Sequence, residues 1–130
     1  MSSGTATIDR GGSASALLDA IPHPVILVDD GGGVAEANMA AQTFFQASTN
    51  VLQRHPLAYF VPFGSPLLTL IEQVRERGAA VNEYRVDIGT PRTGGERIVD
   101  IYATPSLDRR DHVVVVLQER SMADKIDRQL

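Results

Sequence analysis

The pattern of apolar and polar residues begins with a four-residue apolar run, Val25-Ile26-Leu27-Val28. A short continuous run of aliphatic and β-branched residues is typical of a buried strand. The three glycines at 31–33 follow and favour a tight turn, because glycine adopts positive φ without steric cost. The next run, Val34-Ala35-Glu36-Ala37, is typical of a short return strand. The pattern therefore predicts a β-hairpin over residues 25–37.

Helical spacing follows in the middle of the chain. Ser65 and Pro66 favour a helix start, because serine caps free N–H groups and proline fits the first helical position. Apolar residues then recur at i, i+3, i+4 and i+7, and Gly78 is typical of a helix end. These apolar residues are Leu67, Leu70, Ile71 and Val74. Asn38 fits the cap of an earlier helix, and residues 50–63 indicate one or two short helical turns.

Three more strands are predicted after residue 80. In the first two, apolar residues alternate with polar ones, which predicts one buried and one wet face. The alternating residues are Tyr84, Val86 and Ile88 in the first strand and Val99, Ile101 and Ala103 in the second, at 98–103. Residues 112–119 are apolar enough for the centre of a sheet. With a short helix before residue 22, this order predicts an α+β fold whose helices cover one face of an antiparallel five-stranded sheet.

The last strand leads into a segment with helical spacing. Its apolar residues recur at i, i+4 and i+8 among charged residues, a narrow seam typical of the start of a dimeric coiled coil, although they could also be core. We expect residues 120–130 to begin a signalling helix that continues beyond the chain, residues 14–119 to form one sensor domain, and residues 1–13 to be a disordered tail. The predicted dimer and relay residues are Leu17, Ile21, Gln118, Glu119, Arg120, Met122, Ile126 and Leu130.

Composition narrows the function classes. The chain has 130 residues and a net charge of −4, which argues against binding to a phosphate backbone. It contains no cysteine, and therefore no disulfide, thiolate ligand or cysteine nucleophile. No apolar run approaches the ~20 residues that cross a membrane, and the small polar N-terminus lacks the apolar centre of a secretory signal. These features predict a cytoplasmic protein with no nucleic-acid or membrane partner.

Three kinds of residue in the chain could carry chemistry. The histidines, at positions 23, 55 and 112, lack the i, i+4 spacing of a metal site, so we expect no metal ligand among them. The glycine clusters fit turns better than phosphate cradles. The carboxylates fit solvated faces better than an acid–base pair. Those carboxylates are Asp29, Asp30, Glu83, Asp87 and Asp100. We therefore predict no catalytic residue and no cofactor.

The aromatic side chains allow two interpretations. They could line a pocket for a small ligand between the sheet and its helices. They could instead only pack the core, where each buried ring contributes about 1.5–3 kcal/mol. Core packing is the favoured interpretation, and a small-ligand sensor is the alternative. The pocket candidates are Phe44, Phe45, Phe60, Tyr84 and Tyr102.

Several stretches resemble PAS sensor domains. Residues 17–29 are similar to the opening of such domains, and residues 37–45 resemble their N-x-A-A-x-x-x-F helix start. Other stretches resemble, more narrowly, the N-terminal region of the NtrB family of nitrogen-regulation sensor histidine kinases. These are residues 61–68, 81–84, 117–120 and 123–130. The resemblance implies a PAS fold for about Ala16 to Leu130.

The resemblance also implies a cytoplasmic homodimer. Its full-length parent would phosphorylate and dephosphorylate an NtrC-type response regulator under the control of a PII protein. No enzyme activity carries over to this chain, because no histidine here matches the family's His-Glu-x-Lys-Asn-Pro phosphoacceptor motif. One departure is Gln118-Glu119-Arg120-Ser121, which stands where many PAS domains end their last strand with an Asp-x-Thr clamp. A polar junction is expected there, and its bonding pattern is left open.

Overall fold

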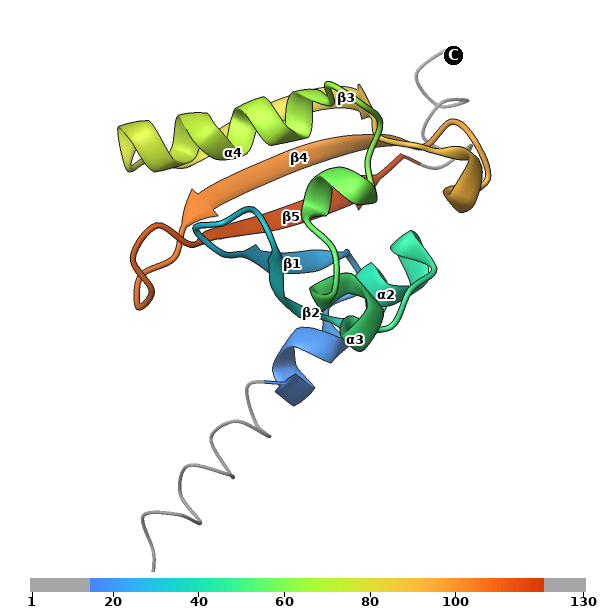
Figure 1. The fold of residues 1–130 in the computed structure, drawn as a ribbon, viewed down its shortest axis with the longest axis horizontal. Helices are drawn as coiled ribbons and strands as arrows, with labels where there is room; N and C mark the ends of the chain where they lie inside the picture. The colour runs from blue at the N-terminus through green and yellow to red at the C-terminus, as the bar shows by residue number, and fades with distance from the viewer. Residues whose placement is uncertain (1–14, 121–130) are drawn as a thin grey trace, which may run out of the picture.

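A computed structural model describes residues 15–120 of the chain. Their framework is a five-stranded antiparallel sheet of order β2-β1-β5-β4-β3 (Figure 1). The strands are β1 (Val25–Val28), β2 (Val34–Ala37), β3 (Val81–Asp87), β4 (Ile98–Pro105) and β5 (Val113–Glu119). The apolar last strand lies at the centre of the sheet, as predicted. It begins at residue 113 rather than 112, and β4 extends beyond the predicted 98–103.

Helices cover one face of this sheet (Figure 1). A short helix over residues 15–20 precedes β1. The segment from β2 to β3 contains α2 (Met39–Phe45), α3 (Thr49–Gln53), the 3-10 turn η1 (Leu57–Tyr59) and α4 (Pro66–Arg77). A second 3-10 turn, η2 (Pro91–Thr93), lies between β3 and β4. The helix α4 packs along β3 and β4, while α2 contacts β1 and β2 and α3 contacts β2. The predicted α+β architecture is confirmed.

The helix ends follow from their capping residues. The side chain of Asn38 accepts a hydrogen bond from the Ala41 N–H at the start of α2, and Ser65 accepts one from the Leu67 N–H at the start of α4. Gly78 ends α4 in the left-handed region, with φ of 66°. Each predicted cap is therefore confirmed.

The core lies between the inner face of the sheet and the helices. The apolar face predicted for α4 is buried, and so is the face that Val99, Ile101 and Ala103 present from β4, each at most 1% exposed. Residues of α2, α3 and η1 complete the core. They are Ala41, Phe44, Phe45, Leu52, Leu57 and Phe60.

The edge strand β3 departs from the predicted alternation. Between the pairs Glu83–Ile101 and Val86–Val99, β3 has two residues where β4 has one, which is a β-bulge. The extra residue turns Tyr84 to the outer face, where its side chain is 65% exposed. The prediction that Tyr84 shares the buried face of Val86 is therefore wrong, because simple period-two alternation does not continue through a bulge.

The two ends of the chain leave some predictions outside the described residues. The tail predicted at residues 1–13 and all but the first residue of the helix predicted at 120–130 lie there. Within residues 15–120, no helix combines the length and the apolar content that a membrane crossing requires.

Candidate functional site at the end of the last strand

The end of β5 is fixed by a charged pair. Arg120 donates from Nε to Asp100 Oδ1 at 3.0 Å and from Nη2 to Asp100 Oδ2 at 2.7 Å. The two side chains are 12% and 19% exposed, so this bidentate pair is shielded from water more than an open surface pair is. The backbone N–H of Arg120 also donates to the Ile98 carbonyl at 3.0 Å. The residue that leads out of β5 is therefore held to β4 by its backbone and by its side chain.

The same carboxylate reaches the bulge in β3. Arg85 has a φ of 58°, an uncommon value for a residue other than glycine, and its backbone N–H donates to Asp100 Oδ1 at 3.0 Å. Asp100 thus bonds the edge strand on one side and Arg120 on the other. A displacement of the bulge would change the geometry at the end of β5, because one carboxylate serves both.

Arg97 connects the end of β5 to the interior. Its Nε donates to Glu119 Oε2 at 2.5 Å, and its Nη1 donates to the Thr93 carbonyl at 3.1 Å. Its guanidinium carbon lies 4.3 Å from the centroid of the Phe44 ring, within the range of a cation–π contact. Since Phe44 belongs to α2, one side chain joins this helix to the last residue of β5.

We call Arg97, Asp100, Glu119 and Arg120 the exit junction. Its charged groups form two ion pairs, Arg97–Glu119 and Arg120–Asp100. These pairs can break or re-form when the strands that carry them are displaced. Of these four residues, the sequence pattern singles out only Glu119 and Arg120 for a role at the end of the strand. The polar side of β4 placed Asp100 correctly, but only the register of β4 on β5 shows that it lies opposite Gln118 at the strand end.

The other predicted relay residues lie apart from this junction or outside the described part of the chain. Leu17 and Ile21, near the 15–20 helix, are 71% and 38% exposed. Residues 122, 126 and 130 lie outside the described residues. The dimer and relay role of these positions stays a prediction.

Asn38 attaches the 15–20 helix to the domain. Its Nδ2 donates to the carbonyls of Leu18 at 2.9 Å and His23 at 3.0 Å. Its Oδ1 accepts from the N–H groups of Val25 and Ala41, both at 2.9 Å. The residue is only 2% exposed. The sequence indicates that Asn38 caps α2, but no local pattern indicates its bonds to the preceding segment.

Comparison with known proteins identifies the family. A family model described as the PAS fold matches residues 14–120. The chain belongs to the PAS family. The crystal structure of the PAS domain of nitrogen regulation protein NR(II) from Vibrio parahaemolyticus shares this fold, with a TM-score of 0.70 and 20% sequence identity. The match covers 82% of this chain and 97% of that one. The predicted PAS fold is confirmed.

This PAS domain is also homologous to part of longer proteins. It is 64% identical over 115 residues to the sensory histidine kinase/phosphatase NtrB of Rhizobium meliloti (strain 1021), covering 88% of this chain and 30% of the relative. It is 37% identical over 116 residues to the NtrB of Azospirillum brasilense, covering 89% of this chain and 29% of the relative. The chain therefore spans about 30% of the length of these relatives.

The five aromatic pocket candidates do not form one site in the PAS domain. Phe44, Phe45 and Phe60 are at most 2% exposed and pack edge to face, with ring centroids 5.0 Å and 6.2 Å apart along the series. Tyr84 and Tyr102 are 65% and 41% exposed. The bulge turns the first tyrosine outward, and alternation along β4 turns the second. Their assignment to an interior pocket is therefore wrong.

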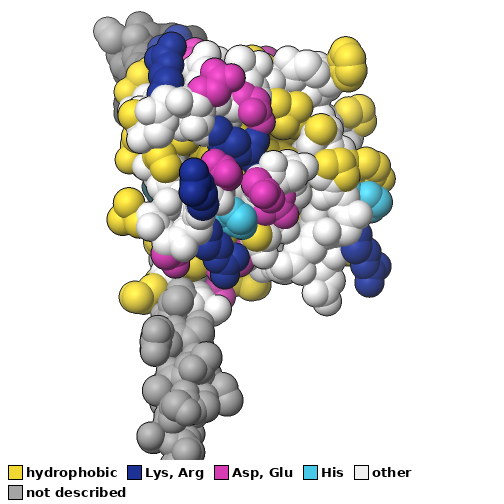
Figure 2. Space-filling model, turned by 60° about the vertical axis from the view of Figure 1, so that its left-hand side comes forward, with side chains coloured by type: hydrophobic (Ala, Val, Ile, Leu, Met, Phe, Trp, Pro, Cys, Tyr) yellow, Lys and Arg dark blue, Asp and Glu magenta, His cyan; other side chains and the backbone are white. Residues whose placement is uncertain are grey.

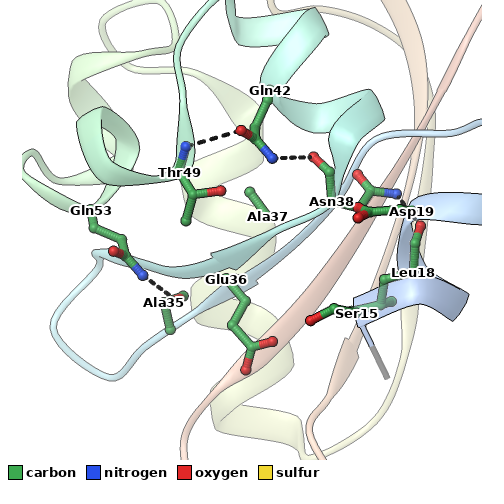
Figure 3. A pocket seen from close by; sticks show the side chains of 10 residues that line it. All are labelled: Ser15, Leu18, Asp19, Ala35, Glu36, Ala37, Asn38, Gln42, Thr49 and Gln53. Carbon is green, nitrogen blue, oxygen red and sulfur yellow. Dashed lines mark hydrogen bonds between the residues drawn. The ribbon is translucent and has the colours of Figure 1, made fainter. Parts of the chain in front are cut away.

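A polar hollow of about 280 Å³ lies between the 15–20 helix, β2, α2 and α3 (Figure 3). The two glutamine amides at its rim are bonded to backbone groups. Gln42 Oε1 accepts from the Thr49 N–H at 3.2 Å, and Gln53 Nε2 donates to the Ala35 carbonyl at 2.7 Å. These bonds hold the connections between α2, α3 and β2, so we read the amides as structural.

The face around the β4–β5 loop carries both signs of charge. Figure 2 shows one face of the molecule on which basic and acidic side chains are interspersed. Arg75 pairs with Glu72 and donates from Nε to the Asp111 carbonyl at 3.0 Å, and Arg109 lies 3.5 Å from Glu36. This face is therefore mixed in charge rather than uniformly basic.

Like Asp100, two more of the carboxylates considered for catalysis accept hydrogen bonds from backbone groups. Asp29 Oδ1 accepts from the N–H groups of Gly31 and Gly33 at 2.9 Å and 2.8 Å and so closes the β1–β2 turn. Asp87 Oδ1 accepts from the N–H groups of Gly89 and Arg97 at 2.9 Å and 3.0 Å. Among residues 15–120, no three His, Cys, Asp or Glu side chains group closely enough to hold a metal ion.

Proposed function

We propose that this chain is the input and dimerisation module of a cytoplasmic sensor histidine kinase of the NtrB type. The observation that carries the proposal is the 64% identity, over 88% of the chain, to a sensory histidine kinase/phosphatase NtrB. Because the chain spans about 30% of that relative, the phosphoacceptor and ATP-binding machinery belongs to the rest of the parent protein.

The proposed partners are those that the resemblance to the NtrB family implies. The parent phosphorylates and dephosphorylates an NtrC-type response regulator, and a PII protein controls the balance between the two activities. The PAS module itself transfers no phosphate. Its part is to shift the parent between a kinase state and a phosphatase state, which is a change of population between two arrangements.

The exit junction supports a mechanical route for this control. The last strand lies at the centre of the sheet, and its final residues are bonded to β3, β4 and α2 through Asp100 and Arg97. A displacement of any of these elements moves the point where the chain leaves the domain. The segment after residue 120 would then carry that displacement to the kinase core as a shift in helix packing.

Asp100→Ala in the full-length parent tests this route. The substitution removes the carboxylate that accepts from the Arg120 guanidinium and from the Arg85 N–H in the bulge. The end of β5 should then no longer be fixed relative to β3 and β4. We expect the ratio of kinase to phosphatase activity toward the response regulator to change about fivefold or more, the lower end of typical allosteric coupling. Phosphate transfer to and from the regulator, with and without the PII protein, measures this ratio.

Asp30→Ala is the matched control for that experiment. Asp30 is an exposed aspartate in the β1–β2 turn, far in sequence from the junction. This variant should regulate as the unmodified parent does. If both variants behave alike, the exit junction does not transmit the control.

The dimer is tested separately at Ile126, in the predicted apolar seam. Light scattering after size-exclusion chromatography should give a dimer for the full-length parent, and a charge in the seam should weaken it because a coiled-coil seam must be apolar. We therefore expect Ile126→Asp to raise the dimer dissociation constant, while Asp127→Ala, a change beside the seam, should leave it unchanged. A monomeric parent at high concentration would refute the dimer.

A further inference from the structure

Phe63 is an exposed aromatic residue that the fold does not use. Its side chain is 106% exposed at the tip of a turn that the Ser65 N–H closes on the Pro62 carbonyl at 3.0 Å. Gly64 provides the left-handed position of this turn, with φ of 70°. Two residues near it in the chain have structural roles, since Val61 is buried in the core and Ser65 caps α4. Phe63 buries nothing, so core packing does not account for a large apolar side chain here.

Tyr59, four residues before Phe63 in the chain, is a second exposed aromatic residue. Tyr59 is 57% exposed, stacks on His55 at 4.2 Å between ring centroids, and contacts the buried Phe60 edge to face. The Arg92 guanidinium carbon, from η2, lies 5.7 Å from the Tyr59 ring centroid. Tyrosine and arginine held in this way are the residue types that dominate protein–protein interfaces. Four residues span at most about 14 Å, so Phe63 falls within the footprint of one ordinary interface with them.

The two chain segments that carry these residues contain basic but no acidic side chains. No Asp or Glu occurs from Ala37 to Ile71, or from Ile88 to Gly95, although the net charge of the chain is −4. The basic residues in these two segments are Arg54 and Arg92, both exposed. An acidic surface is therefore the electrostatic complement of this part of the domain.

We infer that Tyr59, Phe63 and Arg92, which we call the aromatic patch, dock onto an acidic surface of the parent protein's own remaining chain. Charge complementarity argues for an acidic partner. The relatives' length argues for the remaining chain, since about 70% of each relative lies outside the matched part. In this arrangement Phe63 inserts as the apolar anchor and Arg92 pairs with a carboxylate at the rim. The inference rests on the proposed function, because it requires a multidomain parent.

Site-specific photo-crosslinking in the full-length parent tests the inference. Benzoylphenylalanine replaces Phe63, a change that an unburied position tolerates, and irradiation is followed by digestion and mass spectrometry. We expect crosslinks to an Asp- and Glu-rich peptide located after residue 130, in the same copy or in a second copy of the parent. Arg92→Glu, which opposes an acidic partner, should lower the yield several-fold, while Arg77→Glu at the end of α4 should not.

The same probe at Leu107 is the control. Leu107 is 104% exposed in the β4–β5 loop and lies outside the aromatic patch. Equal crosslinking from both positions would overturn the inference, as would crosslinks to another PAS domain or to a separate protein. ATP-dependent histidine phosphorylation of the same preparation tests the proposed function independently. Kinase activity without the crosslink refutes the docking alone, and the crosslink without kinase activity refutes the kinase assignment alone.

Discussion

Phe45→Ala should lower the free energy of unfolding of this domain by about 3–5 kcal/mol. The side chain is 1% exposed and lies between two other rings, with centroids 5.0 Å from Phe44 and 6.2 Å from Phe60. Truncation removes its apolar burial and leaves a cavity lined by those two rings, which the rigid sheet behind them keeps from collapsing. Urea unfolding of residues 1–130, followed by circular dichroism, measures the change in midpoint.

Tyr84→Ala is the matched aromatic control. Its ring is 65% exposed on the outer face of β3, so the change in unfolding free energy should stay within about 0.5 kcal/mol. The dependence of the unfolding free energy on urea concentration should be nearly the same for both variants, since one side chain is a small part of the surface that unfolding exposes. Similar losses from the two variants would mean that the interior does not depend on the phenylalanine cluster.

The positions of Phe45 and Tyr84 show which features of the fold the sequence pattern predicts and which it does not. Helical and strand periodicity, with the caps at Asn38, Ser65 and Gly78, was sufficient for the order of elements and the identity of the central strand. Period-two alternation was sufficient for β4. It was not sufficient for β3, because a bulge is set by how the edge strand pairs with its neighbour, and that pairing leaves no fixed pattern in the strand itself.

The exit junction shows the same limit. Glu119 and Arg120 stand out in the sequence as polar residues at the end of an apolar strand. Their partners come from β4 and the residue before it, and only the register of the sheet brings Arg97 and Asp100 to the end of β5. A polar residue on the wet face of a strand is ordinary, so the sequence offers no reason to single these two out before the fold is known.

Asn38→Ala is the second substitution with a large expected effect. It leaves the buried N–H groups of Val25 and Ala41 without their side-chain acceptor and removes the donor to the carbonyls of Leu18 and His23. An unsatisfied buried backbone group costs about 1–3 kcal/mol, and a lost helix cap about 1 kcal/mol. We expect the free energy of unfolding to fall by about 3 kcal/mol, measured by urea unfolding.

Asn50→Ala is the matched control, because it removes an asparagine side chain at an exposed position. Asn50 is an exposed residue of α3, so its replacement should change stability by no more than about 0.5 kcal/mol. Hydrogen exchange identifies the mechanism, because the Val25 and Ala41 amides should lose protection in Asn38→Ala before the rest of the sheet does. Since the same side chain holds the 15–20 helix, faster proteolysis near Leu18 should accompany the loss. If those amides stay protected, water or a shifted backbone replaces the asparagine, and Asn38 is not the residue that fastens the N-terminal helix to the sheet.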